Sequence, residues 1–335
     1  MRSATAFAHT NIALIKYWGK RPGDDDNGRS LNLPATGSLS MTLDAFGAET
    51  TVALSDDDVD SFVLDGEEVD AKEVTRVSAF LDLVRAQAKS NARCRVTSRN
   101  EVPTAAGLAS SASAFAALAT AACAAFDLDV DDKTASIFAR RGSGSAARSI
   151  FGGFVKMNVG TRDDGTDCFA EPVAVHDALD LKLLVVQCAT GRKKVGSTVG
   201  MNRTAETSPY FQAWVSSHAA DLDACERGLR DGDLDVVGAA MEHSTLKMHA
   251  SALAAQPGLW YWTPTSWSVM ERVRDLRDDG GQCYFTMDAG PHVKVLCPSS
   301  KADALLRELS DVDGVVHASS SAVGQGARVT KVVDG

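Results

Sequence analysis

Two kinds of hydrophobic pattern alternate along the chain. Continuous apolar stretches from Ala4 to Ile15 and from Leu181 to Gln187 predict strands. Shorter stretches predict further strands at residues 94–98, 283–287, 293–297, 315–316 and 328–333, and a pair of strands at 39–44 and 48–54. Apolar spacing of three and four residues predicts helices at 73–89, 111–126, 131–141, 211–230, 234–253, 269–277 and 302–310.

Turn-forming and polar residues separate these elements. Asp65-Gly66 suits a type I′ turn between two short strands, because both residue types tolerate positive φ. The polar segment 195–210 is expected to be a connection into the helices that follow. We expect a domain boundary near residue 190, where the strand 181–187 is followed by Gly191-Arg192-Lys193-Lys194.

Size and charge narrow the classes of function. The 335 residues exceed the size at which one hydrophobic core usually stops growing, so two domains are expected. The net charge of −10 disfavours nucleic acid and an anionic membrane surface as partners, because the long-range field would be repulsive. An anionic small molecule would need a locally basic pocket, which makes individual Lys and Arg residues informative.

Cysteine usage and the apolar segments bear on the compartment. The seven cysteines are scattered and none is spaced as CxxC, so neither a disulfide framework nor a zinc site is expected. The first residues lack the apolar core of a signal peptide, and the most apolar segment, Ala112 to Phe126, is too short to span a bilayer. We therefore expect a protein of the reducing cytoplasm that is not embedded in a membrane.

The stretch PTAAGLASSASAF at residues 103–115 is typical of a phosphate-binding loop. Small residues allow close approach of the backbone, the serines supply hydroxyls, and the helix that follows presents free N–H groups at its N-terminus. The Walker lysine is absent, so a nucleotide would be held by amides and hydroxyls. A small-residue helix start that only packs tightly is an equally good interpretation of this stretch alone.

A second cluster of small residues lies at 142–149, GSGSAARS, between Arg140-Arg141 and Gly152-Gly153. Arginine offers the fork of donors that suits phosphate or carboxylate. Two such loops are hard to explain by packing alone, and the second favours an anion site.

Three further stretches have alternative interpretations. Lys16 and Lys20 flank Tyr17-Trp18 at the end of a predicted strand, where they could bind an anion or simply extend to solvent. Asp288 precedes Ala-Gly-Pro at another strand end, as a functional carboxylate or only a turn residue. The aspartates within 21–29 favour a solvated loop tip over a metal site, and the aromatic cluster 258–264 favours packing over nucleic-acid stacking.

Together these motifs resemble the mevalonate diphosphate decarboxylases of the GHMP small-molecule kinase superfamily. The resemblance extends nearly from end to end. It is carried by NIALIKYWGK at 11–20, the stretch at 103–115, GSGSAARS at 142–149, ETSPY at 206–210, LKMHA at 246–250 and YFTMDAGP at 284–291. The first and last of these are the motifs that discriminate the decarboxylases from the wider superfamily.

The resemblance implies an α+β, two-domain GHMP-kinase fold. Residues 1–190 would form the nucleotide-binding, ribosomal-protein-S5-domain-2-like domain, and residues 191–335 a ferredoxin-like α/β-plait domain. It also implies an ATP- and Mg²⁺-dependent reaction: the 3-hydroxyl of mevalonate 5-diphosphate is phosphorylated, and loss of phosphate and CO₂ gives isopentenyl diphosphate. A homodimer is implied as well.

The resemblance assigns roles to individual residues. Asp288 would accept the hydroxyl proton, Lys16 would offset the developing charge, and Arg148 beside Asn11 would orient the carboxylate and stabilise the leaving phosphate. The implied substrate contacts are Tyr17, Lys20, Ser143, Ser145, Ser197 and Met201. The implied ATP contacts are Gly107, Ser110, Ser111 and Ser113, with Ser111 also a candidate Mg²⁺ ligand.

One position departs from the family pattern. Thr198, after Gly196-Ser197, stands where some bacterial members have a phosphate-binding arginine, and Arg192, Lys193 or Lys194 would have to compensate. Alternatives to the main hypothesis are a decarboxylase or 3-kinase acting on mevalonate 5-phosphate or mevalonate, and a nucleotide-binding regulator without turnover.

Overall fold

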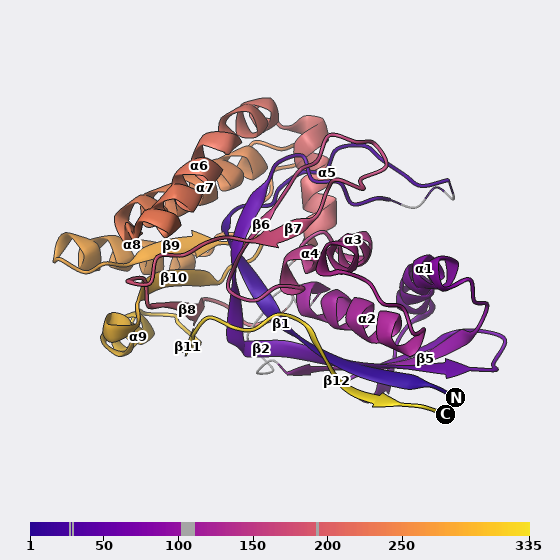
Figure 1. The fold of residues 1–335 in the computed structure, drawn as a ribbon. Coiled ribbons are helices and arrows are strands. Elements are labelled where there is room, and N and C mark those ends of the chain that lie inside the picture. The colour runs from indigo at the N-terminus through magenta and orange to yellow at the C-terminus, as the bar shows by residue number, and fades with distance from the viewer. Residues whose placement is uncertain (27, 29, 102–110, 192–193) are drawn as a thin grey trace.

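The protein is built on two β-sheets, and a helix between them packs against strands of both. The computed structural model describes residues 1–335 except 27, 29, 102–110 and 192–193. Within the described residues, eight strands form one sheet and four form another. Figure 1 shows the first sheet with its helices on one side of the molecule and the second sheet with α6 to α9 on the other.

The first sheet has the order β12-β1-β2-β5-β3-β4, and β6 and β7 extend it from β2. The strands are β1 (Ser3–Ile15), β2 (Ser38–Ser55), β3 (Ser61–Leu64), β4 (Glu67–Glu68), β5 (Arg93–Glu101), β6 (Phe154–Met157), β7 (Ala170–Pro172) and β12 (Arg328–Val333). Because β12 pairs antiparallel with β1, the two chain termini lie close together (Figure 1).

The prediction of two paired strands at 39–44 and 48–54 is wrong. Both segments belong to the single strand β2, which pairs with β1 along most of its length. Asp44 and Ala45 are exposed, which in the sequence suggested a turn. In the structure β2 continues through them, and its pairing register with β1 shifts between His9 and Asn11, opposite this segment. Such an irregularity lets a long strand continue past a polar step. The turn predicted at Asp65-Gly66 is confirmed, with φ of 54° and 87° between β3 and β4.

Helices α1 (Ala71–Ala88), α2 (Ser111–Ala125) and α3 (Asp132–Gly142) share a core with the first sheet. Asp70 and Asp131 begin α1 and α3 by accepting hydrogen bonds from the backbone N–H groups of Glu73 and Thr134. The alanines of α2 belong to the same core as the alanines at 4, 6 and 8 of β1. These small side chains allow α2 to lie close to the sheet, and Ser113 near the start of α2 accepts a hydrogen bond from Thr10 of β1.

The second sheet has the order β11-β8-β10-β9 and consists of β8 (Leu181–Gln187), β9 (Tyr284–Met287), β10 (Val293–Pro298) and β11 (His317–Ser321). Leu184 and Val186 of β8 pack into a core with α8 (Pro264–Asp278) and α9 (Ala302–Ser310). Leu183 and Val185 pack into a core that β1 and β2 share. The strand is therefore apolar without interruption because both of its faces are buried.

Strand pairing assigns β8 to the second sheet and β12 to the first, so the chain crosses between the sheets more than once. The domain division at residue 190 stays a prediction.

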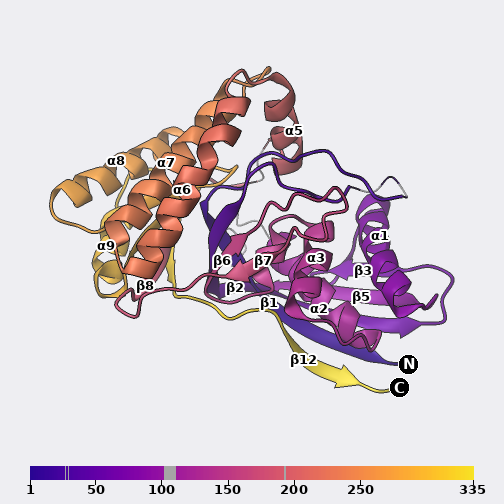
Figure 2. The same ribbon diagram turned by 45° about the horizontal axis from the view of Figure 1, so that its top comes forward.

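Helices α6 (Phe211–Asp231) and α7 (Leu234–Leu253) run side by side over the second sheet, and Figure 2 shows them beside α8. The segment expected to be only a polar connection contains helix α5 (Ser197–Thr207), which packs on α7. Helix α8 begins five residues earlier than predicted, since Thr263 and Ser266 form a capping box and Pro264 occupies the first turn. The short strand expected at 315–316 lies instead at β11.

Within the described part of the chain, none of the helices combines the length and the apolar composition that a bilayer span requires.

Candidate active site

A cavity of about 940 Å³ lies where the ends of β1 and β9 meet the 142–149 segment and the start of α5. Most of the predicted site residues line it: Asn11, Lys16, Tyr17, Lys20, Ser111, Ser143, Ser145, Arg148, Ser197, Met201 and Asp288. Ser113 is fully buried, accepts a hydrogen bond from Thr10 and does not line the cavity, so its assignment to ATP stays a prediction. Gly107 and Ser110 lie outside the described residues.

Each carboxylate oxygen of Asp288 accepts a hydrogen bond from the ammonium group of a different lysine. Lys16 Nζ lies 2.7 Å from Oδ1, and Lys294 Nζ lies 3.0 Å from Oδ2. Both lysine side chains are almost completely buried, whereas 35% of the Asp288 side chain is exposed. The carboxylate is thus the part of this cluster that a ligand in the cavity can reach most easily.

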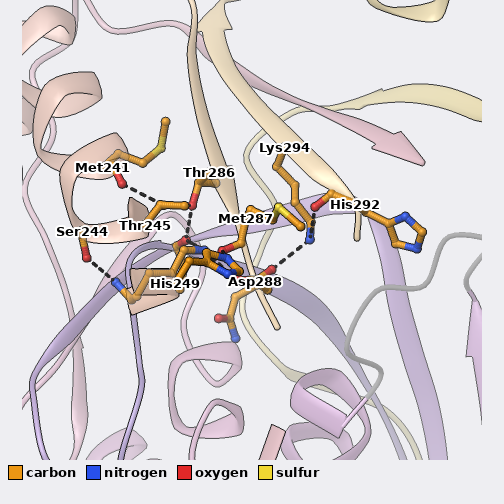
Figure 3. A network of polar contacts seen from close by, with 12 residues as sticks. Met241, Ser244, Thr245, His249, Thr286, Met287, Asp288, His292 and Lys294 are labelled. Carbon is orange, nitrogen blue, oxygen red and sulfur yellow. Dashed lines mark hydrogen bonds and ion pairs between the residues drawn. The ribbon is translucent and has the colours of Figure 1, made fainter. Parts of the chain in front are cut away.

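The end of β1 is held in place by hydrogen bonds to α7 and β9. Lys16 Nζ and Thr286 Oγ1 both donate to the carbonyl of Ala13, and the Thr286 hydroxyl bonds that of Thr245 on α7. The backbone N–H of Lys16 donates to Ser244 Oγ. Figure 3 shows Ser244, Thr245 and Thr286 of this network beside Asp288.

The charges of the cluster shift the pKa values of its members. Burial acts to raise the pKa of Asp288, but the two ammonium groups outweigh it and hold that pKa far below the ordinary value. Burial lowers the pKa of Lys16 to about 8, although Asp288 acts to raise it. His249, which lies against the Met287 carbonyl, has a pKa lowered by burial to about 3 and is neutral near pH 7.

Arg148 presents a third buried cation to the cavity, after Lys16 and Lys294. Its guanidinium donates to Ser40 Oγ at 2.9 Å, Ser38 Oγ at 2.6 Å and Asn11 Oδ1 at 3.2 Å. Asn11 is oriented in turn by donating to the Ser145 carbonyl and Ser149 Oγ. Within the described residues no carboxylate forms an ion pair with Arg148, so its charge is available to an anionic ligand.

Tyr17 closes the cavity beside the 142–149 segment. Its hydroxyl is buried and has no hydrogen-bond partner among the described residues, which leaves it available to a ligand. A Cβ at Gly144 would lie 2.3 Å from this hydroxyl. Glycine at 144 therefore makes room for Tyr17.

Two further basic residues, Lys20 and Arg76, line the cavity. Lys20 Nζ donates to Asn32 Oδ1 at 2.6 Å, and burial together with the nearby charge of Arg76 lowers the pKa of Lys20. Arg76, from α1, donates to the Gly142 carbonyl and lies over the Phe115 ring. These two cations face the same cavity as Arg148, so the pocket is locally basic in a chain of net charge −10.

Hydroxyl groups join the two small-residue segments. Ser143 Oγ donates to Ser111 Oγ at 3.3 Å and lies 3.4 Å from Ser145 Oγ. Ser111 is the first residue of α2, where a helix N-terminus favours anions. Among the described residues no group of three or more His, Cys, Asp or Glu side chains could hold a metal. The hydroxyl of Ser111 fits a Mg²⁺ ion that is bound mainly by phosphate oxygens.

Helix α5 supplies the remaining wall. Its first residue, Ser197, lines the cavity together with Thr198 and the buried Met201. Gly196 precedes the helix with no side chain to cap it. The first turn of α5 therefore presents backbone N–H groups and hydroxyls at the position where some bacterial members of the resembled family have an arginine.

The sequence interpretation missed three residues that matter for this geometry: Lys294, Arg76 and Ser40. A lysine between apolar residues in a buried strand, as in HVKVLC, was the available signal for Lys294. Arg76 and Ser40 lie on a helix and a strand whose patterns are ordinary. Only the tertiary structure brings Arg76 to the cavity and Ser40 to the guanidinium of Arg148.

Comparisons with known proteins agree along most of the chain. Residues 8–170 match the family model for the diphosphomevalonate decarboxylase-like N-terminal domain, and residues 183–331 that for the mevalonate 5-diphosphate decarboxylase C-terminal domain. A diphosphomevalonate decarboxylase of Aspergillus fumigatus is 34% identical over 87% of this chain and 76% of its own length. A phosphomevalonate decarboxylase of Haloferax volcanii is 34% identical over 92% of both chains.

Solved structures show the same fold. The crystal structure of mevalonate diphosphate decarboxylase from Staphylococcus aureus has a TM-score of 0.92 and 39% identity, with 99% of each chain covered. A structure described as MDDEF in complex with MVAPP, AMPPCP and magnesium has a TM-score of 0.90 and 42% identity, and covers 99% of this chain and 100% of its own.

Proposed function

The chain belongs to the diphosphomevalonate decarboxylase family, and we propose that its cavity carries out the reaction of that family. The enzyme decarboxylates mevalonate 5-diphosphate in an ATP-dependent reaction and forms isopentenyl diphosphate, ADP, phosphate and CO₂. This is a step in the mevalonate pathway of isoprenoid biosynthesis.

The arrangement of Lys16, Asp288 and Arg148 in one cavity is the observation that carries the proposal. The reaction needs a proton acceptor for a tertiary hydroxyl and a cation for a carboxylate and a departing phosphate. Asp288 offers carboxylate oxygens to the cavity, and Arg148 is a buried cation without a carboxylate partner among the described residues. Asp288 and Arg148 belong to different parts of the fold, so they can act on different groups of one substrate.

In the first step the 3-hydroxyl oxygen bonds the γ-phosphorus of ATP, ADP leaves, and Asp288 takes the hydroxyl proton. Each Asp288 oxygen has a lone pair beyond the one that accepts a lysine, so it can still accept the hydroxyl. Lys16 stabilises negative charge on the attacking oxygen and the transferred phosphoryl group. Mg²⁺ supplies charge neutralisation on the phosphates when it is bound.

In the second step the bond from C3 to the new phosphate breaks and its electron pair leaves with the phosphate. The bond between C1 and C2 supplies the electrons of the new double bond, and CO₂ departs. Arg148 holds the carboxylate before the step and stabilises the phosphate as it leaves. Its three hydrogen bonds to Ser40, Ser38 and Asn11 fix the guanidinium, so little reorganisation is required.

The remaining lining residues suit the phosphate groups. Tyr17, Lys20, Ser143, Ser145, Ser197 and Met201 contact the substrate and its 5-diphosphate in this proposal. Gly107, Ser110, Ser111 and Ser113 contact ATP, and Ser111 is also the Mg²⁺ ligand. The free Tyr17 hydroxyl and the basic pair Lys20 and Arg76 support a polyanionic ligand.

The alternative substrate is mevalonate 5-phosphate, as the Haloferax volcanii relative is named for that activity. The experiment compares kcat/KM for mevalonate 5-diphosphate, mevalonate 5-phosphate and mevalonate with Mg-ATP. We expect the 5-diphosphate to be preferred by at least about 10²-fold, since lost charge-assisted contacts cost roughly 1.5–3 kcal/mol each. A preference for the monophosphate would assign the chain to the other activity.

We also propose a cytoplasmic homodimer. All seven cysteines are free and buried, which suits a reducing compartment. Trp260, which precedes α8, and Trp267, which lies on α8, are 80% and 50% exposed. Two exposed tryptophans close together in sequence support a subunit contact at the start of α8.

A further inference from the structure

Lys294 is a buried cation that the mechanism above does not use. It lies on β10, and its side chain is 4% exposed. Its ammonium donates to Asp288 Oδ2 at 3.0 Å and to the carbonyl of His292 at 3.3 Å, as Figure 3 shows. The second contact ties the ammonium to the turn that carries Asp288, so both ends of this turn are held by one side chain.

The cluster of Lys16, Lys294 and Asp288 has one positive charge more than is needed to neutralise its carboxylate. One carboxylate faces two ammonium groups, and an ion pair with Lys16 alone would already neutralise Asp288. Taking a further charge out of water is costly unless its contacts compensate. A second lysine also makes the carboxylate a weaker base, because a nearby opposite charge favours the ionised form. Stability and basicity therefore do not explain Lys294, and its geometric effect does.

Geometry provides the explanation. A carboxylate held by one lysine can rotate about its terminal torsion, which is broad and roughly two-fold. With Lys16 on Oδ1 and Lys294 on Oδ2, this rotation would break two charge-assisted hydrogen bonds. Each oxygen is left with one lone pair in a defined direction. A tertiary hydroxyl is crowded, so an acceptor of fixed direction lowers the cost of aligning it with a phosphoryl group.

We propose that Lys294 is a positioning residue for phosphoryl transfer: it fixes the carboxylate of Asp288 in the orientation that receives the substrate hydroxyl. The proposal rests on the function given above. Because the carboxylate is a weak base, the proton moves late, after the bond to phosphorus has made the hydroxyl more acidic.

The charged groups around Asp288 define the expected pH behaviour. Lys16 faces it from the end of β1, Lys294 from β10 and Arg148 from the short helix α4 (Ala146–Ser149). The two imidazoles nearby, His249 on α7 and His292 before β10, have pKa values lowered by burial to about 3 and about 4 and are neutral in the working range. Lys294 lowers the pKa of Lys16, so its removal raises the pH at which Lys16 loses its proton.

The test compares Lys294→Met and Lys294→Arg with the wild-type chain, using Lys182→Met as the control. Lys182 lies on β8 opposite Cys297 of β10, in the same sheet but outside the cavity lining. Lys294→Met leaves a balanced ion pair behind, so we expect it to fold, and circular dichroism and thermal unfolding check this. Activity is followed as ADP and CO₂ release from mevalonate 5-diphosphate between pH 6 and pH 10.

For Lys294→Met we expect kcat to fall about 10- to 100-fold with KM nearly unchanged, as for a misplaced catalytic group. We also expect the basic limb of kcat/KM to move to higher pH. Lys294→Arg should recover part of kcat and return the limb toward the wild-type position, and Lys182→Met should behave as wild type. An unchanged or increased kcat in Lys294→Met overturns the proposal, and so does a loss of kcat with an unmoved limb, which indicates a purely structural role. An inactive wild-type chain would instead refute the proposed function.

Discussion

The ammonium of Lys16 lies 2.7 Å from the carboxylate of Asp288, although 272 positions separate the two residues in the chain. Lys16 follows β1 of the first sheet, and Asp288 follows β9 of the second. The contact therefore joins the two sheets at the cavity. Any displacement of one sheet against the other changes the catalytic pair directly, so the packing of α7 on β1 and β9 is part of the active-site structure.

Replacement of Asp288 by Asn should abolish most activity. It removes the proton acceptor, and a general base contributes about 10²–10⁴-fold. It also leaves two buried ammonium groups without a carboxylate, so we expect the free energy of unfolding to fall by about 1–3 kcal/mol. Steady-state kinetics and urea unfolding measure the two effects. Asp313→Asn, at an exposed position, is the matched control, and near wild-type turnover in Asp288→Asn would show that another group takes the proton.

Replacement of Arg148 by Lys keeps a cation but loses the fork that binds Ser40, Ser38 and Asn11 at once. We expect kcat to fall about 10²–10³-fold, as when a positioned donor to a developing charge is removed. The exposed Arg230→Lys should be indistinguishable from wild type. If Arg148→Lys retained full kcat, charge alone would suffice at this position and the role assigned to the fork would be wrong.

Replacement of Gly144 by Ala places a Cβ 2.3 Å from the Tyr17 hydroxyl. We expect Tyr17 to be displaced, KM for the substrate to rise, and stability to fall by about 1–3 kcal/mol, the usual cost of overpacking. Thermal unfolding and substrate titration measure these changes. At Gly196, with φ of −67° and open space around a new Cβ, alanine should leave the melting temperature nearly unchanged. Equal melting temperatures for both variants would contradict the steric argument.

The pH profile should report the charge of Lys16. Burial lowers its pKa from 10.5 to about 8, so the protonated form that stabilises the transferred phosphoryl group is lost as the pH rises through about 8. We expect kcat/KM to decline above that pH. In Lys16→Arg the cation persists, since arginine stays protonated, and the decline should disappear even if activity is reduced. A decline that is the same in both proteins would assign the limb to another group.

The sequence patterns predicted most of the helices and strands because burial is periodic along them. The strand 181–187 and the helix 234–253 have the predicted bounds. The errors arose where local polarity and tertiary structure disagree. Strand β2 continues through the exposed residues Asp44 and Ala45 because β1 pairs with it both before and after them. Helix α5 forms in a polar segment because it packs on α7.

The site was only partly predictable for a similar reason. Motifs indicated Lys16, Asp288 and the loop that ends in Arg148, since each stands beside small residues or at a strand end. Which charges meet depends on contacts between distant strands, which a single sequence does not contain. The second lysine on Asp288 and the serines that hold Arg148 therefore came from the structure alone.

In the proposed reaction one turnover couples phosphoryl transfer from ATP to loss of the substrate carboxyl group. The most direct measurement of this coupling is the ratio of CO₂ to ADP released from mevalonate 5-diphosphate labelled at the carboxyl carbon, in the presence of Mg-ATP. We expect one CO₂ for each ADP in the wild-type chain, with both lost together in Asp288→Asn. ADP release without CO₂ would contradict the coupling, since the cavity would then only phosphorylate its substrate.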